Sequence, residues 1–368
     1  MQFSYVVPTK IYFEPGCVAK HSAELAAYGA KAMIVTGKTS AKACGALDDV
    51  ISVLEQQNVQ WRHYDGIENN PSLETAVDAA GQAAEFGADF VVGIGGGSPV
   101  DAAKAVAVLA ANPGMAGAEL FKNAFTRALP VVAVPTTAGT GSEVTQYSVL
   151  VRRELQTKMG FGNIHTVPKI ALLDAGYTKT LGQYATVNTA VDAFSHSIEG
   201  YLGNRSTAIA DCLALEAMAV FGTCIPKLAD NDLDMELREK LLYASLLGGI
   251  VISQVGVTAV HGMGYCYTYY KDIPHGMANG LLMSDYLIYA SRFRRDKVEK
   301  ALRAMGFADI EGFRTAMTQL VGTPPQLTAD EVAHYTGQSL LQKGSLGNTA
   351  GPITEQDIRD IWTRVSGQ

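Results

Sequence analysis

Two side chains with the chemistry of metal ligands lie four residues apart in the second half of the chain. Asp192 and His196 occupy the segment TAVDAFSHSIEGY, whose pattern of apolar residues predicts a helix. Residues four apart share one face of a helix, so this carboxylate and this imidazole could bind one metal ion. Such a pair also occurs as an exposed or hydrogen-bonded pair on a helix, and taken alone it does not decide the function.

Two further histidines follow in the segment VHGMGYCYTYYKDIPHGMANG, where His261 and His275 each precede a glycine. His275 also follows Pro274, which favours a turn that opens a new helix. Either histidine alone would be an ordinary core or surface residue, but three histidines and one aspartate are grouped in a half that is otherwise poor in histidine. Three imidazoles and one carboxylate suit Fe²⁺ or Zn²⁺, and they could also accept Co²⁺, Ni²⁺ or Mn²⁺.

The first half carries a glycine-rich segment, GIGGGSPVDAAK, between a predicted strand and a predicted helix. Gly95, Gly96 and Gly97 lack Cβ atoms, so the backbone can turn sharply and approach a ligand closely. Ser98 is the predicted N-cap and Pro99 the predicted first helical position, and the free N–H groups of such a helix favour a phosphate. The alternative is a tight turn without a ligand. Because Ser98 replaces the last glycine of GxGxxG, the pattern indicates a dinucleotide site that differs from the Rossmann fingerprint.

A second polar loop, PTTAGTGSEVT, also follows a predicted strand. It contains four threonines, a serine and two glycines. Hydroxyl and backbone N–H groups at this density suit phosphate or ribose oxygens, although a polar surface turn has the same composition. Ligands of a parallel sheet bind at the carboxyl ends of its strands, and two such loops fit that rule.

Short β-type runs alternate with alanine-rich helical stretches in the first half, and only helical patterns follow. Strands are predicted over 32–37, 61–66, 89–94, 130–134 and 169–174, with helices over 41–57, 72–86 and 99–111. Later helices are predicted over 187–202, 207–228 and 235–253. This order predicts an α/β N-terminal domain with a mainly parallel sheet over 1–182, followed by an all-α C-terminal domain over 183–368.

The composition excludes several classes of partner. The formal net charge is −7 and no dense Lys/Arg cluster occurs, which argues against nucleic acid and anionic membranes. The N-terminus has no pattern of a signal peptide, and no apolar run approaches the roughly 20 residues of a membrane span. The cysteines are scattered and never in CxxC spacing, so we expect buried small hydrophobes in a reducing cytoplasm. They are Cys17, Cys44, Cys212, Cys224 and Cys266.

The four motifs, in this order and spacing, resemble the signatures of the iron-containing (group III) alcohol dehydrogenases. The likeness runs from the N-terminal YVVPTKIYFEPG segment to roughly residue 290. It implies a dinucleotide-binding α/β domain and an all-α domain in a dehydroquinate synthase-like architecture, with a metal site in the cleft between them. It also implies homodimers formed through the N-terminal strands, or larger homo-oligomers.

The resemblance implies roles for individual residues. The metal ligands would be Asp192, His196, His261 and His275, of which His261 and His275 are also the catalytic residues. Gly95, Gly96, Gly97, Ser98 and Asp101 would hold the pyrophosphate. Thr136, Thr137, Thr140 and Thr145 would line the nicotinamide side, while Asn70 and Lys158 would contact ribose or phosphate.

Two departures from the family pattern concern the cofactor and the proton. Many members have an acidic residue after the first βαβ strand, where this chain has Gly37 followed by Lys38 and Thr39. Without the carboxylate a 2′-phosphate is not repelled, so we expect NADP to be favoured over NAD. Many members also have a proton-relaying histidine four residues after the VHG histidine, where this chain has Tyr265. A phenol with a pKa near 10 is a poorer base at pH 7, and the relay stays unassigned.

The function implied is reversible hydride transfer between a small primary alcohol or diol, or its aldehyde, and NAD(P). The cofactor carries the hydride and the protein supplies positioning and electrostatics. One alternative on the same architecture is a lyase similar to dehydroquinate synthase, which uses NAD transiently. A zinc enzyme similar to glycerol dehydrogenase and a non-catalytic module that binds nucleotide and metal are further alternatives.

Overall fold

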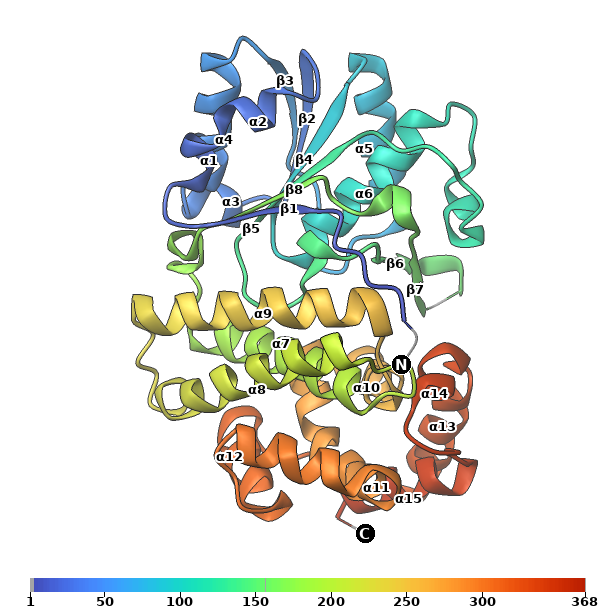
Figure 1. Ribbon diagram of the computed structural model, residues 1–368. Helices are drawn as coiled ribbons and strands as arrows, with labels where there is room; N and C mark the ends of the chain where they lie inside the picture. The colour runs from blue at the N-terminus through green and yellow to red at the C-terminus, as the bar shows by residue number, and fades with distance from the viewer. Residues whose placement is uncertain (1–2, 156, 368) are drawn as a thin grey trace. The chain divides into compact units, whose positions relative to one another are not determined.

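A parallel sheet forms the centre of the N-terminal part of the chain. The computed structural model describes residues 3–155 and 157–367, and residues 6–181 fold as one of two compact units (Figure 1). The sheet order is β1–β8–β5–β4–β2–β3, and every neighbouring pair is parallel. Its strands are β1 (Lys10–Phe13), β2 (Lys31–Thr36), β3 (Gln60–Tyr64), β4 (Phe90–Gly95), β5 (Val131–Pro135) and β8 (Ile170–Leu173). The pairing confirms the predicted α/β class.

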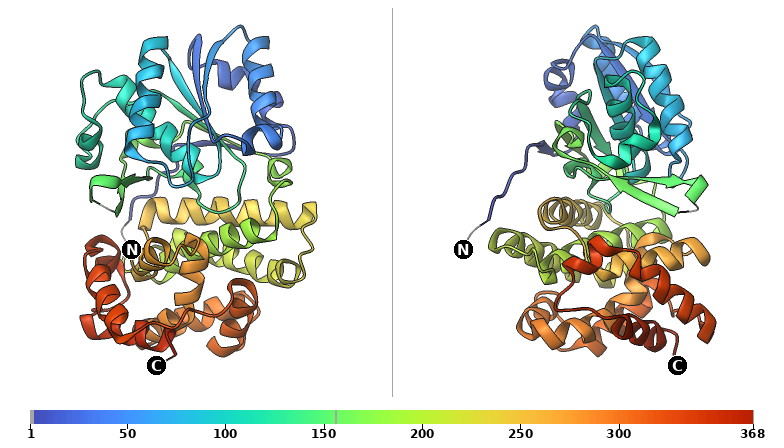
Figure 2. Two further views of the ribbon diagram at one scale, coloured as in Figure 1. Left: turned by 180° about the vertical axis from the view of Figure 1, so that it is seen from behind. Right: turned by 90° about the vertical axis from the view of Figure 1, so that its right-hand side faces the viewer.

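Helices cover both faces of this sheet (Figures 1 and 2). Residues such as Met33 and Val91 pack toward α5 and α6, while Ile34 and Val92 pack toward α1, α2 and α4. Successive side chains of a strand point to opposite faces, so strands buried on both sides read as continuous apolar runs. The helices are α1 (Cys17–Lys20), α2 (Ser22–Ala26), α3 (Ser40–Ala43), α4 (Ala46–Gln56), α5 (Leu73–Phe86) and α6 (Gly97–Ala111).

The predicted strands are all present, with bounds shifted by no more than two residues. The helix predicted over 41–57 is wrong in one respect, because Gly45, with φ 88°, separates α3 from α4. Strand β1 and the antiparallel pair β6 (Ser148–Arg152) and β7 (Thr157–Phe161) lie outside the predictions. Most residues of β1 and β7 are partly exposed, and β6 alternates buried with partly buried residues, so none of the three has the continuous apolar run that marks the central strands.

The second unit comprises residues 182–367 together with residues 3–5, and its regular elements are helices throughout the part of the chain that the structure describes. The long helix α7 packs against α8, α9 and α11 and is buried from Ala190 to Leu202. The helices are α7 (Gln183–Leu202), α8 (Ala208–Ala229), α9 (Met235–Val255), α10 (Ala259–Tyr270), α11 (His275–Ala304), α12 (Ile310–Val321), α13 (Ala329–Leu340), α14 (Lys343–Asn348) and α15 (Glu355–Val365). The all-α prediction is confirmed for this unit.

One helix of this unit, α8, is long and apolar enough to cross a membrane by length and composition, with a mean hydropathy of 1.7 over 18 residues. It carries Asp211, Glu216 and Lys227, and it packs against α7, α9 and α12. Helices α9 and α10 pass the same test only as a pair, and the chain bends by 113° between them. Of the apolar window of α8, 39% is buried inside the structure.

The cysteines do not all follow the expectation of buried small hydrophobes. Cys17, Cys224 and Cys266 are buried, whereas Cys44 is partly exposed and Cys212 is exposed. Cys212 lies on α8 between the buried Ala210 and Ala214, at a position that faces solvent. All five thiols are free.

Candidate metal centre and nucleotide loops

Helix α7 provides the first two predicted metal ligands. Asp192 and His196 lie on one face of α7, and both are buried, with 7% and 5% of their surface exposed. The close approach of α9 to this face depends on Gly248, because a Cβ there would lie 2.8 Å from the carbonyl oxygen of Ala193. The packing therefore removes this aspartate and this histidine from bulk water.

The other two histidines come from α10 and α11. His261 lies in the first turn of α10, and His275 is the first residue of α11, directly after the N-cap Pro274, as the sequence predicts. A Cβ at Gly276 would lie 1.9 Å from the carbonyl oxygen of Asn188 in α7. Only glycine at this position lets the start of α11 come close to α7, which brings His275 toward Asp192.

The carboxylate of Asp192 is the common neighbour of the three imidazoles. Its Oδ1 lies 3.9 Å from Nε2 of His196, 3.7 Å from Nε2 of His261 and 3.9 Å from Nε2 of His275. The ligand atoms of Asp192, His261 and His275 all lie within 4.8 Å of one another. The ring of His196 stacks on that of His261 with centroids 4.8 Å apart. The structure thus brings the four residues together.

This donor set fits a divalent transition metal. Ligand atoms about 2.1 Å from a tetrahedral ion are roughly 3.4 Å apart, and the distances from the Asp192 carboxylate to the three imidazoles, 3.7 to 3.9 Å, are close to this spacing. One carboxylate oxygen and three imidazole nitrogens are the donors that Fe²⁺ and Zn²⁺ accept. The residues present therefore fit the metal that the sequence predicts.

A second buried carboxylate, that of Glu199, was not among the predicted site residues. Glu199 is fully buried and its Oε1 forms a short hydrogen bond with Nδ1 of His261. Burial lowers the pKa of His261, but the charge and hydrogen bond of Glu199 and the charge of Asp192 outweigh it and raise that pKa. The signal in the sequence was the spacing: residues 192, 196 and 199 share one helix face.

Asn279 also faces the cluster and was not predicted. It lies one turn after His275 on α11, and its Nδ2 is 3.3 Å from Oδ1 of Asp192 and 3.5 Å from Nε2 of both His261 and His275. Among the described residues, Oδ1 of Asn279 has no hydrogen-bond partner. The amide therefore offers its donor to the same atoms that would bind a cation.

Tyr265 stacks on the ring of His275, with centroids 5.2 Å apart and an interplanar angle of 15°. Many members of the family that the four sequence motifs resemble carry a histidine at this position. The contact restricts the orientation of the His275 ring and places a phenol beside the cluster.

The predicted nucleotide loops meet at one edge of the parallel sheet. The glycine loop follows β4, the threonine loop follows β5, and Gly37 follows β2, and these three strands are adjacent in the sheet. From β2 the chain continues to β3 on one side, and from β4 it continues to β5 on the other. Such a reversal of strand order is where ligands bind in open α/β sheets.

The glycine and threonine loops pack directly against each other. A Cβ at Gly96 would lie 3.1 Å from Cγ2 of Thr137, and one at Gly97 would lie 2.6 Å from Cγ2 of Thr140. The prediction of Ser98 as N-cap is wrong: Gly96 is the N-cap and α6 begins at Gly97. The extended backbone of Gly96 starts the helix early, which leaves the free N–H groups of the first turn next to the threonines.

Asp101 and Lys104 tie α6 to the threonine loop and to β6. Oδ1 of Asp101 accepts a hydrogen bond from Ser142 at 2.5 Å, and Oδ2 accepts one from the backbone N of Val149 at 2.9 Å. Lys104 is fully buried and donates to Ser142 at 2.8 Å and to the carbonyl oxygen of Tyr147 at 2.6 Å. Burial lowers the pKa of Lys104 to about 8. The Asp101 carboxylate is thus engaged by the protein itself.

The remaining threonines occupy the inner part of the same loop. Thr136 is buried and donates its backbone N–H to the carbonyl oxygen of Gly95 at 2.8 Å, which continues the pairing of β4 and β5. Thr145 is also buried, with its hydroxyl 3.4 Å from the ammonium of Lys104. These two threonines fix the loop, whereas Thr137 and Thr140 are partly exposed.

Asn70, Lys158 and Ser98 form a second group beside the glycine loop. Lys158 donates to Oδ1 of Asn70 at 2.8 Å, and the backbone N of Asn70 donates to the Ser98 hydroxyl at 3.2 Å. Asn70 has a left-handed backbone conformation, with φ 57°. The structure therefore brings together three residues that are remote in sequence and were expected to contact ribose or phosphate.

The end of β2 presents no carboxylate. Gly37 follows the buried Thr36, whose hydroxyl contacts Nε2 of His63 at 2.8 Å, and the side chains of Lys38 and Thr39 are exposed. Burial lowers the pKa of His63, although the charge of Asp65 opposes this. The positive charge at this strand end comes from Lys38.

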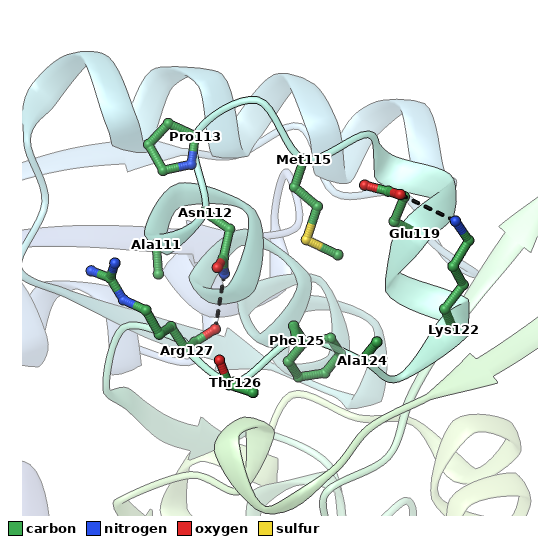
Figure 3. A pocket seen from close by; sticks show the side chains of 10 residues that line it. All are labelled: Ala111, Asn112, Pro113, Met115, Glu119, Lys122, Ala124, Phe125, Thr126 and Arg127. Carbon is green, nitrogen blue, oxygen red and sulfur yellow. Dashed lines mark hydrogen bonds and ion pairs between the residues drawn. The ribbon is translucent and has the colours of Figure 1, made fainter.

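A hollow of about 480 Å³ lies at the other end of α6 (Figure 3). Lys122 at its rim pairs with Glu119 at 3.1 Å, Arg127 is a second cation of the lining, and Nδ2 of Asn112 donates to the carbonyl oxygen of Arg127 at 3.0 Å. A helix of 15 residues is about 22 Å long, so this hollow is remote from the glycine loop at the start of α6. It belongs to neither predicted site.

With this geometry established, comparisons with known proteins identify the family. The family model described as iron-containing alcohol dehydrogenase matches residues 8–175, and the model of the C-terminal part of the same family matches residues 186–334. Lactaldehyde reductase of Escherichia coli is 30% identical, covering 90% of this chain and 91% of its own. The chain belongs to the iron-containing alcohol dehydrogenase family.

Solved structures agree with this assignment. The crystal structure of an iron-containing alcohol dehydrogenase from Thermotoga maritima superposes with a TM-score of 0.92 and 34% identity over all of both chains. The sulfoacetaldehyde reductase of Bifidobacterium kashiwanohense, solved with NAD⁺, has a TM-score of 0.89 and 25% identity, also over all of both chains.

Other relatives differ in the cofactor and substrate that their names give. The NADPH-dependent butanol dehydrogenase of Clostridium saccharobutylicum is 28% identical over 83% of this chain and 78% of its own. The 1,3-propanediol dehydrogenase of Klebsiella pneumoniae is 28% identical over 99% of this chain and 98% of its own.

Proposed function

We propose that this protein catalyses the reversible oxidation of a small primary alcohol or diol to its aldehyde, with NAD(P) as the hydride acceptor. The observation that carries the proposal is the arrangement of three imidazoles within 3.9 Å of the Asp192 carboxylate in a member of this family. Relatives named lactaldehyde reductase and 1,3-propanediol dehydrogenase support a short substrate with one or two hydroxyl groups.

The helical unit is proposed to hold the metal and the substrate. Asp192, His196, His261 and His275 would bind a divalent ion, with Fe²⁺ the native metal, and His261 and His275 are the proposed catalytic residues. When bound, the ion supplies the Lewis acidity that stabilises negative charge on a substrate oxygen. Because Asp192 is buried, its negative charge acts in a poorly screened environment, which strengthens the hold on a cation.

The α/β unit is proposed to hold the nucleotide, with a functional boundary near residue 182. The first-turn N–H groups of α6 at Gly97 and Ser98 would receive the pyrophosphate, and Thr137 and Thr140 would orient the nicotinamide side. Asn70 and Lys158 would contact ribose or phosphate. The engaged carboxylate of Asp101 supports a role in holding the loop rather than in contacting the pyrophosphate, because two anions at close range repel each other.

We propose NADP as the preferred cofactor. The exposed Lys38 and Thr39 at the end of β2, and the absence of a carboxylate at Gly37, support this choice because they favour a 2′-phosphate. The relative named as an NADPH-dependent butanol dehydrogenase supports it, whereas the relative solved with NAD⁺ shows that the fold also accepts the other cofactor.

We propose a cytoplasmic homodimer or larger homo-oligomer. Strand β1 lies at an edge of the sheet, and Val6 and Val7, which precede it in the same unit, are exposed apolar residues, which supports an interface at the N-terminal strands. Five free thiols support a reducing compartment. Light scattering of the purified protein measures the oligomeric state directly.

The test of the proposed function is a screen of purified, metal-loaded protein with alcohols and aldehydes of two to six carbons. With at least one alcohol we expect stoichiometric accumulation of NADPH, at a higher rate than NADH accumulates from NAD. The metal content of the protein is measured in parallel. A lyase would regenerate its cofactor and accumulate none. His261→Ala should lose turnover while it keeps its affinity for NADPH. Absence of turnover with every alcohol would overturn the proposal.

A further inference from the structure

Glu199 lies on the same face of α7 as two of the proposed metal ligands. It follows Asp192 and His196 at the spacing i, i+4, i+7, and 0% of its surface is exposed. An ionised carboxylate at such depth needs hydrogen-bond donors to offset the loss of water. The identity of those donors defines what Glu199 does.

Among the residues that the structure describes, every hydrogen-bond donor to Glu199 belongs to the start of α10. Oε2 accepts hydrogen bonds from the backbone N of Thr258 at 2.8 Å, from the Thr258 hydroxyl at 2.7 Å and from the backbone N of His261 at 3.3 Å. The N-cap residue Thr258 makes no side-chain cap of its own. Glu199 therefore acts as the cap of α10 from another helix. It fixes where α10 begins and so where the backbone of His261 lies.

The second oxygen of Glu199 sets the orientation of the His261 ring. Oε1 contacts Nδ1 of His261, while Nε2 on the other side of the ring lies 3.7 Å from Oδ1 of Asp192. A carboxylate only accepts hydrogen bonds, so Nδ1 must be the nitrogen that donates. In the neutral ring, the lone pair then belongs to Nε2, which points at the cluster.

We propose that Glu199 is a positioning residue that holds His261 in the Nδ1–H tautomer, with the lone pair of Nε2 available to a divalent cation beside Asp192. The inference rests on the metal-dependent function proposed above. One carboxylate thereby combines two tasks: Oε2 places the backbone of α10, and Oε1 selects the nitrogen that binds the ion. Such partners of a metal-bound imidazole affect affinity strongly.

Glu199→Gln separates these tasks. The backbone donors of Thr258 and His261 require an oxygen on their side, so the glutamine keeps its Oε1 there and turns its NH₂ toward Nδ1 of His261. An NH₂ group donates, which forces His261 to carry its proton on Nε2. The helix start is kept while the metal-binding nitrogen is blocked.

Thr349→Val is the matched control. The Thr349 hydroxyl accepts a hydrogen bond from the backbone N of Ala259 at 3.0 Å, so its removal also damages the start of α10. It does not contact the imidazole of His261. Any loss of metal affinity that follows only from a loosened α10 would appear in this variant as well.

The experiment titrates metal-free wild type and both variants with Zn²⁺ and Co²⁺ by calorimetry, without nucleotide or substrate. We expect Glu199→Gln to bind each ion about 10- to 100-fold more weakly, with an altered visible spectrum of the Co²⁺ form. Thr349→Val should lose thermal stability and keep wild-type affinity. Equal affinity of wild type and Glu199→Gln, or an equal loss in both variants, would overturn the proposal.

A measurement on the wild type covers the case in which Glu199→Gln does not fold. In Zn²⁺-loaded protein with ¹⁵N-labelled histidine, His261 should carry its proton on Nδ1, and a proton-free Nδ1 contradicts the inference. A failure of the proposed function would give a different experimental result from a failure of this inference. A protein that binds Zn²⁺ in this way but oxidises no alcohol leaves the role of Glu199 standing and removes only the dehydrogenase.

Discussion

The ammonium of Lys104 lies 2.8 Å from the hydroxyl of Ser142, which joins α6 to the threonine loop inside the sheet unit. Lys104 also donates to the carbonyl oxygen of Tyr147 and is 3.9 Å from the carboxylate of Asp101. A fully buried charge is stable only when such partners surround it. The two loops proposed to hold the nucleotide therefore depend on one cation.

Lys104→Met should weaken cofactor binding and the fold together. Methionine keeps the length of the side chain but leaves Asp101 without its cation, and breaking a buried pair costs about 3 to 5 kcal/mol. We expect the free energy of unfolding to fall by about 3 kcal/mol and the KM for NADP to rise at least tenfold. Lys122→Met, in an exposed pair, should change stability by less than about 1 kcal/mol. Equal effects of both substitutions would contradict the assignment.

Glu143→Gln should change how stability depends on pH. Glu143 is fully buried, Oε1 has no hydrogen-bond partner among the described residues, and burial raises the pKa of its carboxyl to about 7 despite the nearby Lys104. Between the unfolded pKa of about 4.5 and pH 7, the unfolded chain ionises first, so the stability of the wild type falls as pH rises. The fall amounts to at most about 3 kcal/mol.

Denaturant unfolding at pH 5 and pH 7.5 measures this difference. Glutamine mimics the protonated acid, so Glu143→Gln should gain stability relative to the wild type as the pH rises through this interval. A constant difference between the two proteins at both pH values would show that Glu143 ionises normally in the fold.

Gly97→Ala should disturb the contact between the two loops. A Cβ at this position would lie 2.6 Å from Cγ2 of Thr140, so the threonine must move. We expect the dissociation constant of NADPH to rise about tenfold, because the proposed pyrophosphate site shifts. Thr140→Ser removes Cγ2 and should restore binding in the double variant. Gly81→Ala, where no atom lies within 4 Å of the added Cβ, should leave binding unchanged.

Local patterns predicted the strands that precede the nucleotide loops and the helix that carries Asp192 and His196, whereas no bounds were predicted for α10, α11 or β7. Central strands such as β4 are buried on both faces and read as apolar runs, and Asp192 and His196 share a helix face by spacing alone. The grouping of these two with His261 and His275 rested on the scarcity of histidine in that half, and the family resemblance implied that all four are ligands, because spacing within a helix cannot show which helices meet.

Residues whose role depends on packing between helices escaped prediction. Glu199 reaches His261, and Asn279 reaches Asp192, only because α7, α10 and α11 lie against one another. The N-cap of α6 was misplaced because a serine is a strong cap locally, whereas the extended backbone of Gly96 starts the helix two residues earlier, where only glycines leave room for Thr137 and Thr140.

Gly37→Asp should move the cofactor preference from NADP toward NAD. An added carboxylate at the end of β2 would repel a 2′-phosphate, and a repulsion of about 1.4 to 3 kcal/mol corresponds to a 10- to 100-fold change in the ratio of kcat/KM values. Gly37→Ala is the control, because a Cβ there lies 3.2 Å from the carbonyl oxygen of Ile67. A wild type that already prefers NAD would refute the NADP proposal.

Asn279→Asp should make the cluster bind a cation more tightly and make the metal-free protein less stable. The amide Nδ2 now lies 3.3 Å from Oδ1 of Asp192 and 3.5 Å from Nε2 of His261, and the substitution replaces a donor by negative charge. Without a cation, two carboxylates repel each other at this distance; with Zn²⁺ bound, the added charge attracts the ion.

Thermal unfolding of Asn279→Asp with and without Zn²⁺ should therefore show a larger stabilisation by the metal than in the wild type, with an affinity at least tenfold higher. Asn279→Leu is the control that removes the amide without adding charge, and it should not increase metal affinity. If Zn²⁺ stabilises wild type and Asn279→Asp equally, the amide does not face a cation site, and the geometry around Asp192 would need another explanation.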